Sequence, residues 1–80
     1  MKQFIEYILK NIVSKPESVI VEESEDQGQT LYSLTVAPED MGIVIGKEGR
    51  NINAIRNMAK AKAIKENVRI RIFLNEEPHD

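Results

Sequence analysis

The chain has 80 residues, 41% of them hydrophobic, no cysteine and a net charge of −2. Its small size excludes a second domain, the missing thiols exclude a disulfide framework or a cysteine-based zinc site, and the net charge by itself argues against a nucleic-acid partner. Since no apolar run is long enough for a membrane span or a signal peptide, a cytoplasmic location is expected.

The first predicted element is an amphipathic helix over residues 1–13. Its apolar side chains recur at the spacing of one helix face. Pro16 disfavours helical geometry at Lys15, so the helix is expected to end before it. The apolar face consists of Phe4, Ile5, Ile8, Leu9, Ile12 and Val13.

Two β-strands are predicted next, over residues 18–23 and 30–36, and we expect them to pair as a hairpin. The polar stretch 24–29 between them contains Gly28, which adopts a positive φ without steric cost. In the second strand alternate residues are apolar and are predicted to face the core. The inward set is Tyr32, Leu34 and Val36, and the outward set is Leu31, Ser33 and Thr35.

A short helix is predicted over residues 38–44, because Pro38 suits the first turn of a helix and the acids after it favour the positive end of the helix dipole. Gly46 and Gly49 interrupt this helix. A longer helix is expected to begin near Arg50 and to end at Asn67, which is a plausible cap. From it, Ile52, Ile55, Met58 and Ala59 are expected to face the core, and Arg56, Lys60 and Lys62 to face solvent.

The last predicted element is a strand over residues 68–74, in which apolar residues alternate with Arg69 and Arg71 on the outer face. Residues 76–80 are acidic, contain Pro78 and are expected to form a loose tail, so the domain is expected to span residues 1–75. The predicted order is helix, strand, strand, helix, helix, strand, which is an α+β fold.

The most informative stretch for function is the glycine loop, Gly46-Lys47-Glu48-Gly49, between the two later helices. Two glycines that flank two exposed residues allow a tight turn and a close approach to a sugar–phosphate chain, since no Cβ stands in the way. The loop precedes a helix N-terminus, where open N–H groups and the helix dipole attract phosphate, and Lys47 and Arg50 add positive charge. The loop is therefore predicted to bind anions.

The distribution of charge supports this interpretation. Residues 1–41 carry three lysines and eight acids, residues 42–74 carry eight basic groups and two acids, and residues 75–80 carry three acids, so the segments have charges of −5, +6 and −3. The basic segment holds the glycine loop, as expected of a nucleic-acid-binding surface. For its lysines alone, a solvated helix face is an equally good explanation.

A simple turn and a nucleotide-binding P-loop are the alternatives to phosphate binding for the same loop. A bare pair of glycines more often only builds a turn. A nucleotide-hydrolysing P-loop does not fit, because three residues separate Gly42 from Gly46, and Glu48 follows Lys47 where serine or threonine is needed. Glu48 opposes a phosphate, although its cost is small if the side chain points to solvent.

Aromatic stacking platforms, which many single-strand binders use, are not expected in this chain. Each aromatic residue is assigned a place in or near the core, namely Phe4, Tyr7, Tyr32 and Phe73. Bases are instead expected to meet Ile45 and Ile52 in a groove. The sequence shows no nucleophile–base pair or metal-ligand cluster, and His79 lies in the tail, so no enzymatic activity, metal or cofactor is predicted.

The segment Val44-Ile45-Gly46-Lys47-Glu48-Gly49, followed by Ile52 and Ile55, resembles the (V/I)-I-G-x-x-G-x-x-I-x-x-I core of KH domains. The element order resembles the type II KH arrangement, and the length resembles the bacterial single-KH proteins of the KhpA type. This resemblance implies a three-stranded mixed sheet backed by three helices, with RNA-binding or RNA-chaperone activity. It also implies homodimers or heterodimers with a larger Jag-type KH protein, and a link to cell shape and wall growth.

We therefore predict a type II KH domain that binds single-stranded RNA through the glycine loop. The alternative is a protein-interaction module that keeps the KH shape and mainly dimerises, with Met41, Ile43, Val44 and Met58 near the contact. The residues predicted to bind RNA are Ile45, Gly46, Lys47, Glu48, Gly49, Arg50, Asn51 and Ile52.

Overall fold

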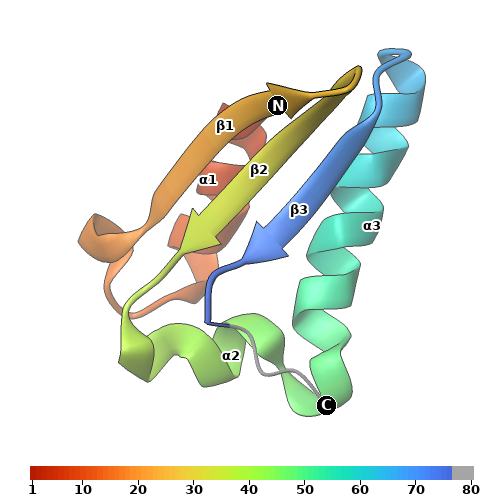
Figure 1. Ribbon diagram of the computed structural model, residues 1–80. Helices are drawn as coiled ribbons and strands as arrows, with labels where there is room; N and C mark the ends of the chain where they lie inside the picture. The colour runs from red at the N-terminus through yellow and green to blue at the C-terminus, as the bar shows by residue number, and fades with distance from the viewer. Residues whose placement is uncertain (77–80) are drawn as a thin grey trace.

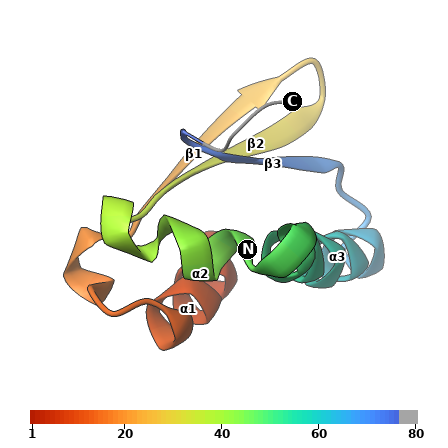
Figure 2. The same ribbon diagram turned by 90° about the horizontal axis from the view of Figure 1, so that it is seen from below.

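The computed structural model describes residues 1–76 and shows three α-helices on one face of a three-stranded sheet (Figures 1 and 2). The elements are α1 (Lys2–Ile12), β1 (Ile20–Asp26), β2 (Gln29–Thr35), α2 (Met41–Ile45), α3 (Arg50–Lys65) and β3 (Ile70–Leu74). Short 3₁₀ turns lie at Pro16–Ser18, Pro38–Asp40 and Lys47–Gly49. The predicted α+β order and mixed sheet are confirmed. The tail predicted over residues 76–80 lies, apart from Glu76, outside the described residues.

The sheet has β2 at its centre, paired antiparallel with β1 and parallel with β3. Inward-facing residues meet across both pairings, since Leu34 lies opposite Val21 on one side and Leu74 on the other. Within residues 1–76 every helix lies on this inward face, so the outer face of the sheet is not covered by a helix (Figure 2).

The core fills the space between the sheet and the helices. The alternation predicted for the second strand is confirmed, because Tyr32 and Leu34 are buried and Val36 is buried just beyond the end of β2. The large side chains that are almost fully buried come from α1, β2, α2 and α3: Ile5, Leu9, Leu34, Val44 and Ile52.

The hairpin is longer than predicted. β1 continues to Asp26 and β2 begins at Gln29, so the loop expected over residues 24–29 is a two-residue turn of Gln27 and Gly28. Both turn residues have a positive φ, 50° and 82°, as in the turns that match the twist of paired strands. The polar residues before the turn belong to the strand because much of β1 faces solvent, where polar side chains are compatible with strand geometry.

The inward stripe of α3 consists of Ile52, Ile55, Ala59 and Ala63. The prediction that Met58 joins this stripe is wrong, since its side chain is 46% exposed. Met58 lies about 100° around the helix from Ala59, which takes it off the inward face. The prediction for Asn67 is confirmed: it has a φ of 60° just past the helix, and the next N–H, of Val68, donates to the Ala63 carbonyl at 2.9 Å.

Asp40 anchors the entrance to α2 and is 3% exposed. Its carboxylate accepts hydrogen bonds from the Ser14 hydroxyl (2.7 Å), the Ser14 N–H (2.9 Å) and the Lys15 N–H (3.1 Å). Because these donors favour the charged form, with the Ser14 hydroxyl contributing most, the pKa of Asp40 lies below its ordinary value of 3.8. The segment that follows α1 is thereby tied to the start of α2.

Candidate nucleic-acid interface

The glycine loop joins α2 to α3 at one end of the molecule (Figure 1). Gly46 has a φ of 75° and a ψ of 173°, a combination essentially restricted to glycine. A Cβ at this position would lie 2.7–2.9 Å from the side chain and backbone nitrogen of Asn51. Position 46 therefore requires glycine for two reasons: the torsion angles of its backbone and the close approach of α3.

Asn51 holds the two helices together at this point. Its side-chain amide donates a 2.6 Å hydrogen bond to the carbonyl of Ile43, near the C-terminus of α2. Carbonyls at a helix C-terminus lack partners within the helix, so this bond satisfies one of them. Asn51 was predicted to adjoin the RNA; in the structure its amide nitrogen is engaged within the protein and fixes the shape of the loop.

The tip of the loop presents charged side chains to solvent. Lys47, Glu48 and Arg50 are all exposed, and Glu48 adopts a left-handed conformation with a φ of 57°. Gly49 is the N-cap residue of α3, and no side chain in residues 1–76 hydrogen bonds there as a cap. The first turn of α3 thus keeps the positive end of its dipole beside Lys47 and Arg50, an arrangement suited to an anion.

The two isoleucines predicted to floor a groove lie behind the loop. Ile45 is half-buried and packs against the core. Ile52 is 1% exposed, because it belongs to the inward stripe of α3. Ile52 therefore supports the loop from beneath and does not lie on the surface of a groove.

A groove with a volume of about 350 Å³ lies between α3 and β3. Arg56 lies fewer than two turns beyond the start of α3, so the groove begins close to the glycine loop. A neighbouring hollow shares Lys60, Ile70 and Arg71 with it and extends toward Arg69. We call this site the α3–β3 groove; its described lining is Arg56, Lys60, Ile70, Arg71, Ile72 and Phe73, with three cations and no acid.

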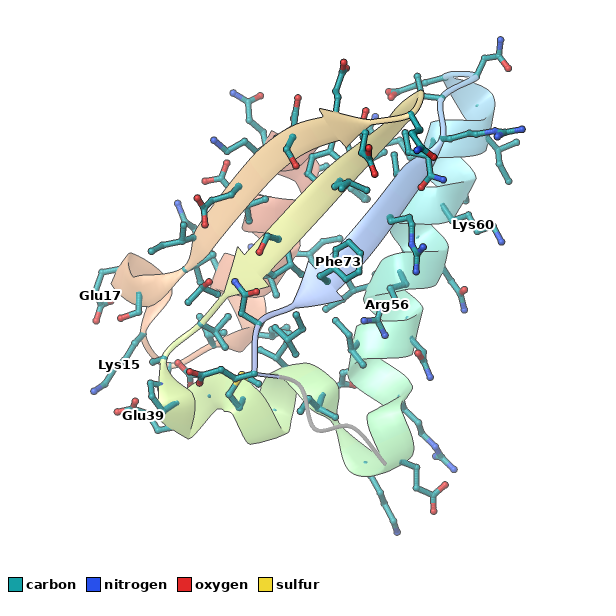
Figure 3. The ribbon with its side chains drawn as sticks, in the orientation of Figure 1. Lys15, Glu17, Glu39, Arg56, Lys60 and Phe73 are labelled. Carbon is teal, nitrogen blue, oxygen red and sulfur yellow. The ribbon has the colours of Figure 1, made fainter. Side chains whose placement is uncertain are left out.

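The role of this groove was not predicted from the sequence. Both Arg56 and Lys60 were predicted to face solvent. Lys60 is exposed, as predicted, and also lines the groove, whereas Arg56 is half-buried there and donates a long, 3.4 Å hydrogen bond to the Ile72 carbonyl of β3. Figure 3 shows Arg56 on α3 and Phe73 on the adjoining strand. The alternation of the last strand could have predicted the aromatic part of the groove, because inward-facing Ile72 and Leu74 require Phe73 to face outward.

The aromatic residues are only partly where they were expected. Tyr32 is buried in the core, as predicted, and Phe4 is half-buried. The core positions expected for Tyr7 and Phe73 are wrong, since these side chains are 70% and 43% exposed. Phe73 therefore adds an exposed aromatic ring to the α3–β3 groove.

None of the helices in residues 1–76 has the length and apolar character needed to cross a bilayer. The same residues contain no group of three or more histidine, cysteine or acidic side chains arranged to hold a metal ion. His79 lies outside them.

Comparison with known proteins gives a consistent result. The family model described as KhpA/KhpB, KH domain matches residues 2–74. The chain is 46% identical over 77 residues to the RNA-binding protein KhpA of Chlamydia trachomatis serovar D, covering 96% of this chain and 99% of that protein. It is 50% identical over 70 residues to the RNA-binding protein KhpA of Clostridium perfringens (strain 13 / Type A), covering 88% and 93%.

Proposed function

Since the chain belongs to the KhpA/KhpB family of KH-domain proteins, we propose that it is a non-enzymatic protein that binds single-stranded RNA through the glycine loop and the α3–β3 groove. The relatives in Chlamydia and Clostridium bear the name RNA-binding protein. The observation that carries the proposal is the loop: the close contact of Gly46 with Asn51 fixes a shape that exposes Lys47 and Arg50 beside the N-terminus of α3.

The loop and the groove have different tasks in this proposal. Contacts of Lys47 and Arg50 with phosphates position the strand and supply affinity without reading sequence. Bases turn toward the groove, where Arg56 and Lys60 offer hydrogen-bond donors and the half-buried Ile70 offers an apolar surface. A duplex keeps its bases stacked inside, so an unpaired strand is the fitting ligand.

The test of the loop is the double substitution Lys47→Asp and Glu48→Asp. Both side chains are exposed, so the protein should stay folded while a phosphate is repelled. We expect binding to a mixed single-stranded RNA pool, measured by fluorescence anisotropy, to weaken roughly tenfold or more. Lys2→Asp, which makes the same charge change on α1, should have little effect. Unchanged binding by the folded double variant would contradict the loop assignment.

The form of the nucleic acid provides an independent test. Single-stranded RNA should compete for binding better than a duplex of the same sequence. The logarithm of affinity should fall with the logarithm of salt concentration, with a slope of about −0.7 for each phosphate neutralised. Equal competition by the duplex would instead indicate a general basic patch.

We extend the proposal to RNA-chaperone activity. A protein that holds RNA mainly through its backbone releases it without strong sequence selection, which suits annealing and refolding of strands. An RNA-annealing assay with the wild-type chain and the loop double variant tests this, because acceleration by the wild type should be lost in the variant. The link to cell shape and wall growth rests on the family resemblance alone.

A second candidate function is pairing with another KH-domain chain. The surface formed by α1, α2 and α3 favours it. A hollow of about 430 Å³ lies between α1, α2 and α3, and Ile43 at its rim is 50% exposed. Val44, which we expected near such a contact, is fully buried, and Met41 packs against the core. The apolar lining of this helical hollow is Ile8, Ile12, Ile43, Ala54, Ile55 and Met58.

The helical hollow and the α3–β3 groove lie on opposite sides of α3, with Met58 toward one and Arg56 toward the other. Met58→Asp should therefore abolish self-association in sedimentation equilibrium and leave RNA affinity unchanged. Ile64→Asp, at an exposed isoleucine outside the hollow, should leave association unchanged. A wild-type chain that stays monomeric at high concentration would remove the homodimer.

A further inference from the structure

Arg71 and Phe73 stand on the outer face of β3, where no helix of residues 1–76 covers the sheet (Figures 2 and 3). They are two residues apart in a strand, so both side chains project from the same face. The guanidinium of Arg71 lies over the Phe73 ring, 5.3 Å from its centroid. The two side chains thus form a cation–π pair on an open surface.

The neighbouring strand β2 leaves the ring of Phe73 uncovered. Its partner in the register with β2 is Ser33, a small residue whose hydroxyl donates a 3.1 Å hydrogen bond to the Asn75 side chain. The ring is left 43% exposed, although burial of such a ring is favourable. An exposed aromatic ring with a preformed cationic partner points to an interaction surface.

This surface is continuous with the α3–β3 groove. Arg71 and Phe73 line the groove together with Arg56 and Lys60, and β3 is an edge strand of the described sheet. A strand of RNA that leaves the groove toward the sheet therefore reaches the Phe73 ring without leaving a positively charged surface.

The charges around Phe73 indicate its occupant. Three cations lie along the same groove, whereas the other exposed aromatic residue, Tyr7, lies beside Glu6 and Lys10, which form an ion pair at 3.9 Å. An aromatic face combined with positive charge matches a nucleotide, whose base stacks while its phosphate meets the cations. The surroundings of Tyr7 carry no such excess of positive charge.

We propose that Arg71 and Phe73 form a stacking platform for a nucleobase of single-stranded RNA that continues past the α3–β3 groove onto the outer face of the sheet. This inference rests on the proposed function and extends it: the bound RNA is longer than the glycine loop and groove alone require. Stacking of one base strengthens binding about five- to a hundred-fold, and it tolerates any base because each has a π face.

The experiment compares oligouridylates of four and eight nucleotides, because only the longer one is expected to continue past the groove onto the outer face of the sheet. Phe73→Leu keeps an apolar side chain of similar size but removes the π face. It should weaken the eight-nucleotide RNA about five- to a hundred-fold and the four-nucleotide RNA, which ends within the groove, by a smaller factor. Equal weakening of the two RNAs would overturn the platform. Phe73→Tyr should restore wild-type binding. A 2-aminopurine placed at successive positions should show stacking-induced quenching at one position, which Phe73→Leu abolishes.

Two control variants distinguish a failure of this inference from a failure of the proposed function. Tyr7→Leu makes the same kind of change at an exposed aromatic outside the groove and should alter neither affinity. The loop double variant should weaken both RNAs. If it does so while Phe73→Leu changes neither, the platform is wrong and the proposed function stands. If the loop double variant changes neither RNA, the proposed function itself fails. If Phe73→Leu alters sedimentation and not RNA affinity, the surface binds protein, which overturns the platform.

Discussion

Two turns of the molecule contain almost the same local geometry. Gln27 and Gly28 of the hairpin have φ angles of 50° and 82°, and Glu48 and Gly49 of the glycine loop have 57° and 75°. The difference lies in Gly46, which has no counterpart in the hairpin turn. A Cβ on Gly28 would meet nothing within 4 Å, whereas a Cβ on Gly46 would meet Asn51 at 2.7 Å. The hairpin needs torsional freedom only, but the glycine loop also needs a close contact that fixes its shape.

The largest effect expected from this comparison is that of Gly46→Ala. The new Cβ forces the backbone of α3 to shift, so we expect the free energy of unfolding in urea to fall by about 2–4 kcal/mol and RNA binding to weaken. Gly28→Ala carries only the left-handed penalty, about 1 kcal/mol, and should leave RNA binding unchanged. Equal losses of stability for the two variants would contradict the distinction between the turns.

A smaller effect is expected at Asp40, which anchors the entrance to the segment that carries the glycine loop. Its pKa is lowered in the folded state, so its contribution to stability is complete above its ordinary pKa of 3.8 and is lost as the pH falls through the lower folded value. Asp40→Asn should lower the urea midpoint at neutral pH. It should also remove the part of the acid-induced loss of stability that comes from protonation of Asp40. Parallel pH profiles of wild type and variant below pH 3.8 would contradict the assignment.

Glu39 is the matched control for the Asp40 substitution, because its pKa is also lowered, mainly by a hydrogen bond from the Lys15 ammonium. Both members of this ion pair, Lys15 and Glu39, are exposed, and an exposed ion pair contributes little to stability. Glu39→Gln should therefore change the urea midpoint less than Asp40→Asn does.

The smallest effect concerns the two residues with a left-handed backbone next to a glycine. Asparagine tolerates this conformation better than glutamine or glutamate, so Gln27→Asn and Glu48→Asn should each stabilise the fold by about 0.5 kcal/mol. Only Glu48→Asn should also raise RNA affinity, by a few-fold at low salt, because it removes a negative charge at the loop tip. Thermal melts measure the stability of the two variants, and fluorescence anisotropy measures their RNA affinity. An equal gain in affinity for Gln27→Asn would contradict the loop assignment.

The elements with strong periodicity could be predicted from the sequence. Alternation identified the inward face of β2, and apolar residues at helical spacing identified α1. The glycine loop was also predictable, since Gly46 and Gly49 interrupt two helical segments. In these regions local preference and tertiary packing favour the same structure.

Other features depend on contacts that no local pattern encodes. Ser24 and Glu25 have the composition of a loop but belong to β1, because pairing with β2 and an exposed face stabilise them there. The hydrogen bond from Asn51 to Ile43 depends on how α2 and α3 meet. Phe73 is different: strand alternation places it outward, but its hydrophobicity led to a core assignment. The α3–β3 groove was missed for this reason.

The order of strands has a consequence for how quickly and in which orientation RNA associates. β1 carries Glu22, Glu23, Glu25 and Asp26 along one edge of the sheet, and β3 carries Arg71 at the other edge. Two strand spacings, about 10 Å, separate these edges, comparable to the screening length at physiological ionic strength. An approaching polyanion would be repelled by β1 and attracted by β3. The acidic residues would thereby rotate the molecule so that the proposed RNA-binding face meets the polyanion during diffusional encounter, which would raise the fraction of productive collisions.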